Sequence, residues 1–159
     1  MSSHLPAPKE IRDLLGGLLD RPVALSPSAP LAPTPKNPCT VGVYVDDLLQ
    51  VTALIGFDLP LSAHAGAAIG LVPVAGAEGA IAEGVLDDTL RGNLYEVLNI
   101  AASLFNVEGA THVRLYDVHH TGTALPPDVL ARSLTLGRRE DLAVDVPGYG
   151  SGRLSVVLV

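Results

Sequence analysis

The chain has 159 residues and a mass of 16.4 kDa, about the size of one globular domain. Hydrophobic residues make up 48% of it, which is enough to build a buried core and argues against a disordered chain. Seventeen acidic residues against ten basic ones give a net charge of −7. Because this is the wrong sign for neutralising phosphates, the composition argues against binding to nucleic acid or to an anionic membrane.

Cysteine use and the first residues indicate the compartment. Cys39 is the single cysteine, so no intrachain disulfide can form, and no Cys/His spacing resembles a zinc site. The first ten residues lack the basic and apolar regions of a secretory signal. The charge-free stretch between Asp58 and Glu78 is interrupted by Pro60 and Pro73, which is unlike a membrane span. The sequence therefore predicts a cytoplasmic protein.

The first half of the chain predicts one helix, one connector and one hairpin. Apolar residues at helical spacing predict an amphipathic helix from Pro8 to Leu19. Five prolines in residues 27–38 predict an extended connector. Alternating apolar residues predict a β-hairpin over Thr40–Phe57, with Asp46 and Asp47 in its turn.

The second half is richer in helices. Ser62 is predicted to cap a small-residue helix that ends near Val72, and a Gly/Ala-rich stretch of weak periodicity follows it. The clearest apolar stripe predicts a helix from Asp88 or Thr89 to Phe105. The remaining expected elements are a strand at Val113–His119, a short helix at Asp128–Leu134 and a closing hairpin over residues 142–158 with its turn at Gly148–Gly152.

This order of elements predicts an α+β fold, with an antiparallel or mixed sheet of about six strands and helices packed on one face. Residues 1–39 would form an N-terminal helix and a Pro-rich connector. Residues 40–159 would form the α+β domain, with one structural domain overall. Exposed strand edges and the high apolar fraction make a homodimer an expectation.

One face of the helix predicted at residues 88–105 could carry chemistry. Glu96 and Asn99 fall opposite its apolar stripe, together with Gly92 and Ser103. Taken on spacing alone, an acid and an amide three residues apart are typical of a solvated helix face. Flanking small residues would also let another protein approach the helix closely.

The segment from Gly92 to Ser103 resembles the phosphatase helix of the CheC/CheX chemotaxis family. That family's pattern is Asp or Ser, three residues, Glu, two residues, Asn, and often Gly four residues later. Glu96 and Asn99 match the pattern, whereas Gly92 stands in place of Asp or Ser and Ser103 in place of Gly. The order of elements over most of residues 40–159 also resembles the CheX fold.

The resemblance implies a protein that docks onto the phosphorylated receiver domain of a response regulator and promotes hydrolysis of its aspartyl phosphate. Asn99 would orient the attacking water, and Glu96 would anchor the helix on a cationic receiver residue. Gly92, Tyr95 and Ser103 would complete the partner-binding surface. The chain would need no cofactor, since any magnesium ion would belong to the receiver. The alternative is a non-catalytic signalling or scaffold module with the same fold.

Other candidate groups have structural explanations. His119 and His120 are neighbours in a predicted strand, so their side chains would point to opposite faces and could not chelate one metal. The pair Asp87–Asp88 suits a helix N-cap. Cys39 has no base nearby and is expected to be a shielded thiol.

Overall fold

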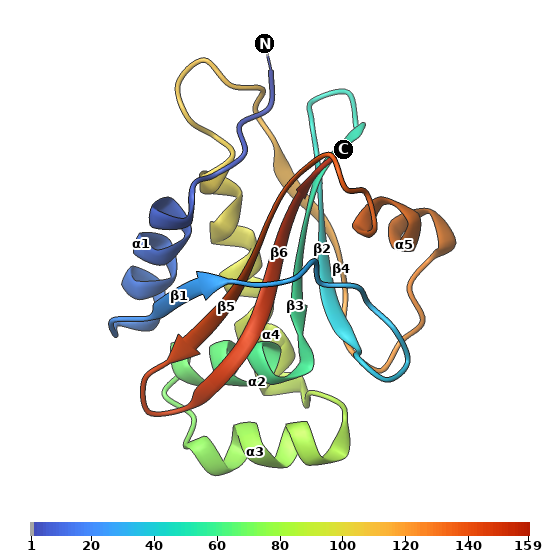
Figure 1. The fold of residues 1–159 in the computed structure, drawn as a ribbon. Coiled ribbons are helices and arrows are strands. Elements are labelled where there is room, and N and C mark those ends of the chain that lie inside the picture. The colour runs from blue at the N-terminus through green and yellow to red at the C-terminus, as the bar shows by residue number, and fades with distance from the viewer. Residues whose placement is uncertain (1) are drawn as a thin grey trace.

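The computed structural model describes residues 2–159, all but Met1, which lies outside the described residues. The strands form one sheet with helices on both sides (Figure 1). In chain order the elements are α1 (Pro8–Leu19), β1 (Ala24–Pro27), β2 (Cys39–Val45), β3 (Val51–Asp58), α2 (Leu59–Ile69), α3 (Val74–Glu83), α4 (Asp88–Ile100), the 3₁₀ helix η1 (Ala101–Leu104), β4 (Arg114–His119), α5 (Pro127–Ser133), β5 (Arg138–Val146) and β6 (Gly150–Leu158).

The sheet has six strands in the order β1-β5-β6-β3-β2-β4, and every neighbouring pair is antiparallel. The α+β class and the number of strands expected from the sequence are therefore confirmed. Both hairpins form as predicted, since β2 pairs with β3 and β5 pairs with β6. In the first hairpin, an Asp46 side-chain oxygen accepts the backbone N–H groups of Leu48 and Gln50, each at 2.9 Å, so this aspartate shapes the turn.

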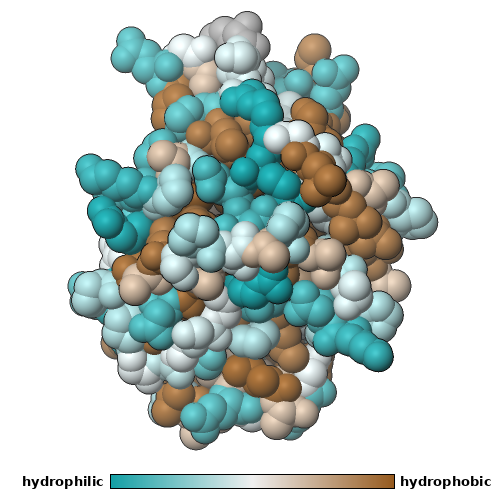
Figure 2. Space-filling view, in the orientation of Figure 1, coloured by the Kyte–Doolittle hydropathy of each residue, from teal (hydrophilic) through white to brown (hydrophobic). Residues whose placement is uncertain are grey.

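The two faces of the sheet are covered differently. One main hydrophobic cluster joins α1, α2 and α4 to one face of the sheet. A second cluster lies on the other face, where Val129 of α5 packs with Val41 and Val43 of β2. The expectation that helices cover one face is thus wrong for α5. Figure 2, in the same orientation as Figure 1, shows hydrophobic residues at the upper right of the surface, surrounded by polar residues.

The Pro-rich connector covers part of this second face rather than acting as a spacer. It crosses in front of β5 and β6 in Figure 1, and its Leu31 is only 2% exposed. The Arg153 side chain donates to the Ser28 hydroxyl at 2.9 Å and to the Ala29 carbonyl at 2.7 Å, which holds the start of the connector to β6. Just before it, β1 adds an edge strand that the sequence analysis did not place. Because proline has no N–H to donate to a neighbouring strand, Pro27 at the end of β1 is compatible with a position at the sheet edge.

Helix α2 begins earlier than predicted. Its N-cap is Asp58, whose carboxylate accepts the Leu61 N–H at 2.9 Å, and the helix ends at Ile69. Ser62, the predicted cap, lies inside the helix. Its buried hydroxyl donates within the core, 3.2 Å from the Phe57 carbonyl and 3.1 Å from the Thr40 hydroxyl. The residue that ends β3 therefore also starts the helix.

The other helices follow the prediction more closely. Helix α1 has the predicted bounds, and the Gly/Ala-rich stretch forms α3, of which only Ala77 and Ala80 are buried. Asp87 caps α4 by accepting the Leu90 N–H at 2.9 Å. The regular helix ends at Ile100, and the remainder of the predicted helix continues as η1. Within residues 2–159, no helix is long and apolar enough to cross a membrane.

Candidate functional site

Helix α4 is fixed by contacts on its inner side. Its apolar stripe is buried, with Leu90, Leu94, Val97 and Leu98 at 2% exposure or less. These residues set the rotation of the helix, because a turn about its axis would expose them.

Two hydrogen bonds add to the packing. The buried Tyr44 hydroxyl donates to the Leu98 carbonyl, which ties β2 to α4. The Asn93 amide donates to the Gly66 carbonyl at 2.9 Å, which ties α4 to α2. The outer face of α4 is therefore presented by a rigid support.

The residues singled out from the sequence all lie on this outer face. All five are exposed: Gly92, Tyr95, Glu96, Asn99 and Ser103. Tyr95, the largest of them, is 47% exposed. The spacing between Gly92, Glu96, Asn99 and Ser103 places them along one stripe. We call these five residues the α4 face.

The side chains of Glu96 and Asn99 form no hydrogen bond and no ion pair with any of residues 2–159. Both side chains therefore keep their full hydrogen-bonding capacity for a partner. A carboxylate accepts only, whereas an amide both donates and accepts. The pair thus offers an anionic anchor beside a group that can hold a water molecule from two sides.

The two positions that depart from the family pattern, Gly92 and Ser103, lie in different local structures. Apart from its chain neighbours and the helix backbone around it, no atom lies within 4 Å of the position that a Cβ at Gly92 would take, so packing does not require glycine there. Ser103 lies in η1 rather than in the regular helix. An aspartate or a serine would fit at position 92.

The chain segment that contains α4 is acidic. Between Leu59 and Val113 the chain has six acidic residues and one basic residue, Arg91. Arg91, which no pattern in the sequence singled out, lies one turn before Tyr95. Its Nε atom is buried and has no hydrogen-bond partner among residues 2–159. Burial lowers the pKa of His120, and the nearby charge of Arg91 adds to that effect.

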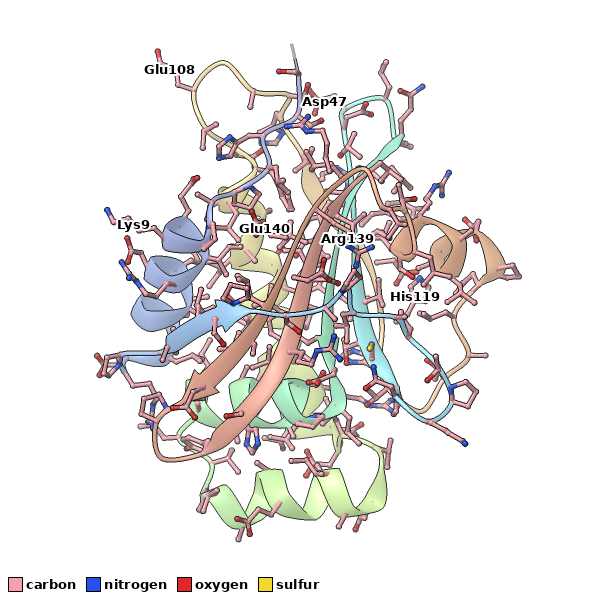
Figure 3. All side chains as sticks on the ribbon, viewed as in Figure 1. Lys9, Asp47, Glu108, His119, Arg139 and Glu140 are labelled. Atoms are coloured by element: carbon pink, nitrogen blue, oxygen red, sulfur yellow. The ribbon has the colours of Figure 1, made fainter. Side chains whose placement is uncertain are left out.

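The remaining sequence candidates do not assemble into a site. His119, on β4 in Figure 3, lies 3.7 Å from Asp117, and the exposed His112 lies 3.7 Å from Asp47. No group of three His, Cys, Asp or Glu residues that could hold a metal occurs in the described part of the chain. Cys39 is buried, and burial raises the pKa of its thiol to about 12, so the reactive thiolate is scarce at neutral pH.

Comparison with known proteins identifies the fold. No protein-family model and no curated protein sequence matches the chain. Among solved structures, the FliM–SpeE complex from H. pylori contains a chain that matches with a TM-score of 0.60 and 6% identity, over 94% of this chain and 80% of that one. The fold is FliM-like. The FliG–FliM complex from H. pylori matches with a TM-score of 0.51 and 8% identity, over 94% of this chain and 91% of that one.

The FliM-like fold agrees with the expected CheC/CheX-like arrangement of strands and helices, which is confirmed at the level of the fold. The likeness also extends further than the sequence resemblance did. Because 94% of this chain is covered, it includes much of residues 1–39 as well as residues 40–159.

Proposed function

We propose that this protein docks the α4 face onto the phosphorylated receiver domain of a response regulator and promotes hydrolysis of the aspartyl phosphate there. The observation that carries the proposal is the Glu96–Asn99 pair, exposed on a well-supported helix, whose side chains have no partner among residues 2–159. The FliM-like fold adds support, because the similar structures are complexes of FliM with SpeE and with FliG. In those proteins, at least, the fold occurs in complexes with other proteins.

The proposed reaction requires only a few groups from this chain. An acyl phosphate is already activated towards water, so the docked protein has only to place a water molecule in line with the phosphorus and stabilise that geometry. The Asn99 amide orients the water by donating to it and accepting from it. The Glu96 carboxylate pairs with a cationic receiver residue, since its charge would be costly if it were buried unpaired in the interface. This chain forms no covalent intermediate, and any magnesium ion belongs to the receiver.

A second candidate function is docking without catalysis. Gly92 favours it, because this position lacks the acid or hydroxyl of the CheC/CheX pattern and thus one possible contact with the receiver. The same face would then bind a signalling partner without altering the lifetime of its phosphate.

Phosphate release from receiver domains distinguishes the two candidates. Receivers of the same organism are charged with a small phosphodonor, and phosphate release is followed with the wild-type protein and with Asn99→Ala. We expect the wild type to accelerate release from one receiver and Asn99→Ala to reduce that acceleration at least about tenfold while binding persists. Gln50→Ala, which truncates an exposed amide in the β2–β3 turn, is the matched control and should keep the full rate.

Binding without acceleration would favour the docking module. An unchanged rate for Asn99→Ala would contradict the role of the amide.

Gly92→Asp tests the proposal by adding a group rather than removing one, because the open space at this position accommodates the side chain. If the departure at position 92 weakens anchoring, Gly92→Asp increases the rate or the affinity, whereas Glu108→Gln, at an exposed loop residue (Figure 3), leaves both unchanged.

A further inference from the structure

A cavity of about 440 Å³ lies between the connector and the loop that joins β4 to α5. These two segments lie at the right of Figure 1, on the side of the sheet opposite α4. Its walls are Pro33, Pro35 and Pro38 of the connector, Cys39 of β2, the loop residues 121–125 and Leu130 of α5. Ligand sites for small molecules commonly have volumes of about 300–1,000 Å³, so the cavity has the size of such a site.

The lining of the cavity selects against charge. No Asp, Glu, Lys, Arg or His is among the eleven residues that line it, and six of them are Pro, Leu or Ala. A charged ligand would lose hydration without gaining a charged partner, which is costly. An uncharged, largely apolar molecule would lose little and would bury apolar surface.

Two residues that line the cavity are buried in the protein: Cys39 and Thr121 are 4% and 1% exposed. The Cys39 thiol is already used, since it donates to the Asn37 carbonyl at 3.5 Å. The Thr121 hydroxyl is buried and has no hydrogen-bond partner within residues 2–159. The hydroxyl oxygen presents almost no surface to the cavity, so a bound molecule would meet mainly the apolar part of the lining.

Local hydrogen bonds hold the walls in place. Thr34 and Asn37 exchange two backbone hydrogen bonds of 3.1 and 3.0 Å, which close the proline-rich turn. The Thr123 hydroxyl donates to the His120 carbonyl at 2.7 Å, which closes the opposite loop. Because the prolines also have fixed φ angles, a ligand would find the site largely preformed and would spend little free energy on ordering it.

We propose that this cavity binds a small uncharged molecule that is largely apolar. The apolar part lies against the prolines, Leu125 and Leu130. Since the site is on the opposite side of the sheet from the α4 face, the proposal does not depend on the function proposed above.

Three probes of nearly equal size and different charge test the proposal: benzyl alcohol, benzoate and benzylamine. Each is titrated into the ¹⁵N-labelled protein while backbone amide shifts are followed by NMR. We expect benzyl alcohol to shift the amides of residues 121–125 and Cys39 saturably, with an affinity in the millimolar range that suits so small a ligand. Benzoate and benzylamine should bind at least about tenfold more weakly.

Variants locate the site. Ala124 is exposed at the rim, so Ala124→Trp should block the cavity without disturbing the core and abolish the shifts. Ala131→Trp places the same side chain on an exposed part of α5 that does not line the cavity and should leave binding intact.

Three outcomes would overturn the proposal: no saturable shift with benzyl alcohol, equal binding of all three probes, or binding that persists in Ala124→Trp.

Discussion

Leu49 is held in a backbone conformation that its side chain disfavours. It lies in the turn between β2 and β3 with a φ of 61°, in the left-handed region, and is 59% exposed. This conformation costs a residue with a side chain about 1 kcal/mol, and the exposed side chain regains little of it by packing. Leu49→Gly should therefore raise the free energy of unfolding by up to about 1 kcal/mol, measured by urea denaturation.

Leu48 is the matched control for this prediction. It is 79% exposed in the same turn but does not have a positive φ. Leu48→Gly should lower stability slightly, because glycine there only adds freedom to the unfolded chain. Equal losses for the two substitutions would show that the left-handed backbone at Leu49 carries no cost.

His64 on α2 makes the fold sensitive to mild acid. It is 6% exposed, and its Nδ1 atom has no partner among residues 2–159. Burial lowers the pKa of His64 below its ordinary value of 6.5, against the opposing charges of Asp58, Glu78 and Asp145. Between the lowered pKa and 6.5 the unfolded chain therefore binds more protons than the folded chain.

Stability should consequently fall as the pH drops below 6.5, and this part of the loss should be absent in His64→Gln. The free energy of unfolding of both proteins, measured from pH 7.5 to the acid limit of folding, tests this. Parallel pH profiles for the two proteins would exclude His64 as the cause.

At the scale of elements, one ion pair joins the connector, α5 and β5. Arg139 on β5 (Figure 3) pairs with Asp141 through two contacts of 2.7 and 2.9 Å, and both side chains are only 7% exposed. Arg139 also donates to the carbonyls of Ser133 and Thr135, and Asp141 accepts the Leu31 N–H at 2.8 Å. The pair thus fixes three chain segments at one place.

Removing one partner of this pair should be costly, because it leaves the other charge buried and unpaired. Arg139→Ala should lower the free energy of unfolding by about 3–5 kcal/mol. The exposed pair Arg132–Asp128 on α5 is the control, and Arg132→Ala should cost less than about 1 kcal/mol. If thermal or urea unfolding gave similar small losses for both, the pair would not be what holds the connector to the sheet.

At the scale of the whole molecule, negative charge is unevenly distributed. Residues 59–113, which contain α2, α3 and α4, have six acidic residues and one basic residue, whereas residues 114–159 have five arginines and five acidic residues. An acidic α4 side favours a cationic partner and speeds its approach. If the proposed docking is correct, association with the receiver should slow several-fold between about 50 and 300 mM salt, as screening shortens the range of the attraction.

Stopped-flow association rates at several salt concentrations measure this effect. Glu96→Gln should flatten the salt dependence, and Glu108→Gln, in the loop after η1, should change it less. A salt-independent rate would mean that the acidic side of the molecule does not guide the partner.

The sequence by itself determined the elements whose burial pattern is local. The apolar spacing of α1 and of most of α4, and the alternation in both hairpins, record which side of each element is buried, so their positions followed without knowledge of their neighbours. The spacing of Glu96 and Asn99 on one helix face followed for the same reason.

Tertiary structure decided the features that depend on which segments meet. It added β1 at the sheet edge, laid the connector over the second face and put α5 on that face. It also made Asp58 rather than Ser62 the N-cap of α2. It left the α4 face uncovered and enclosed the cavity between residues 33–39 and residues 121–130. These outcomes rest on contacts between residues far apart in the chain, which local hydrophobic periodicity does not record.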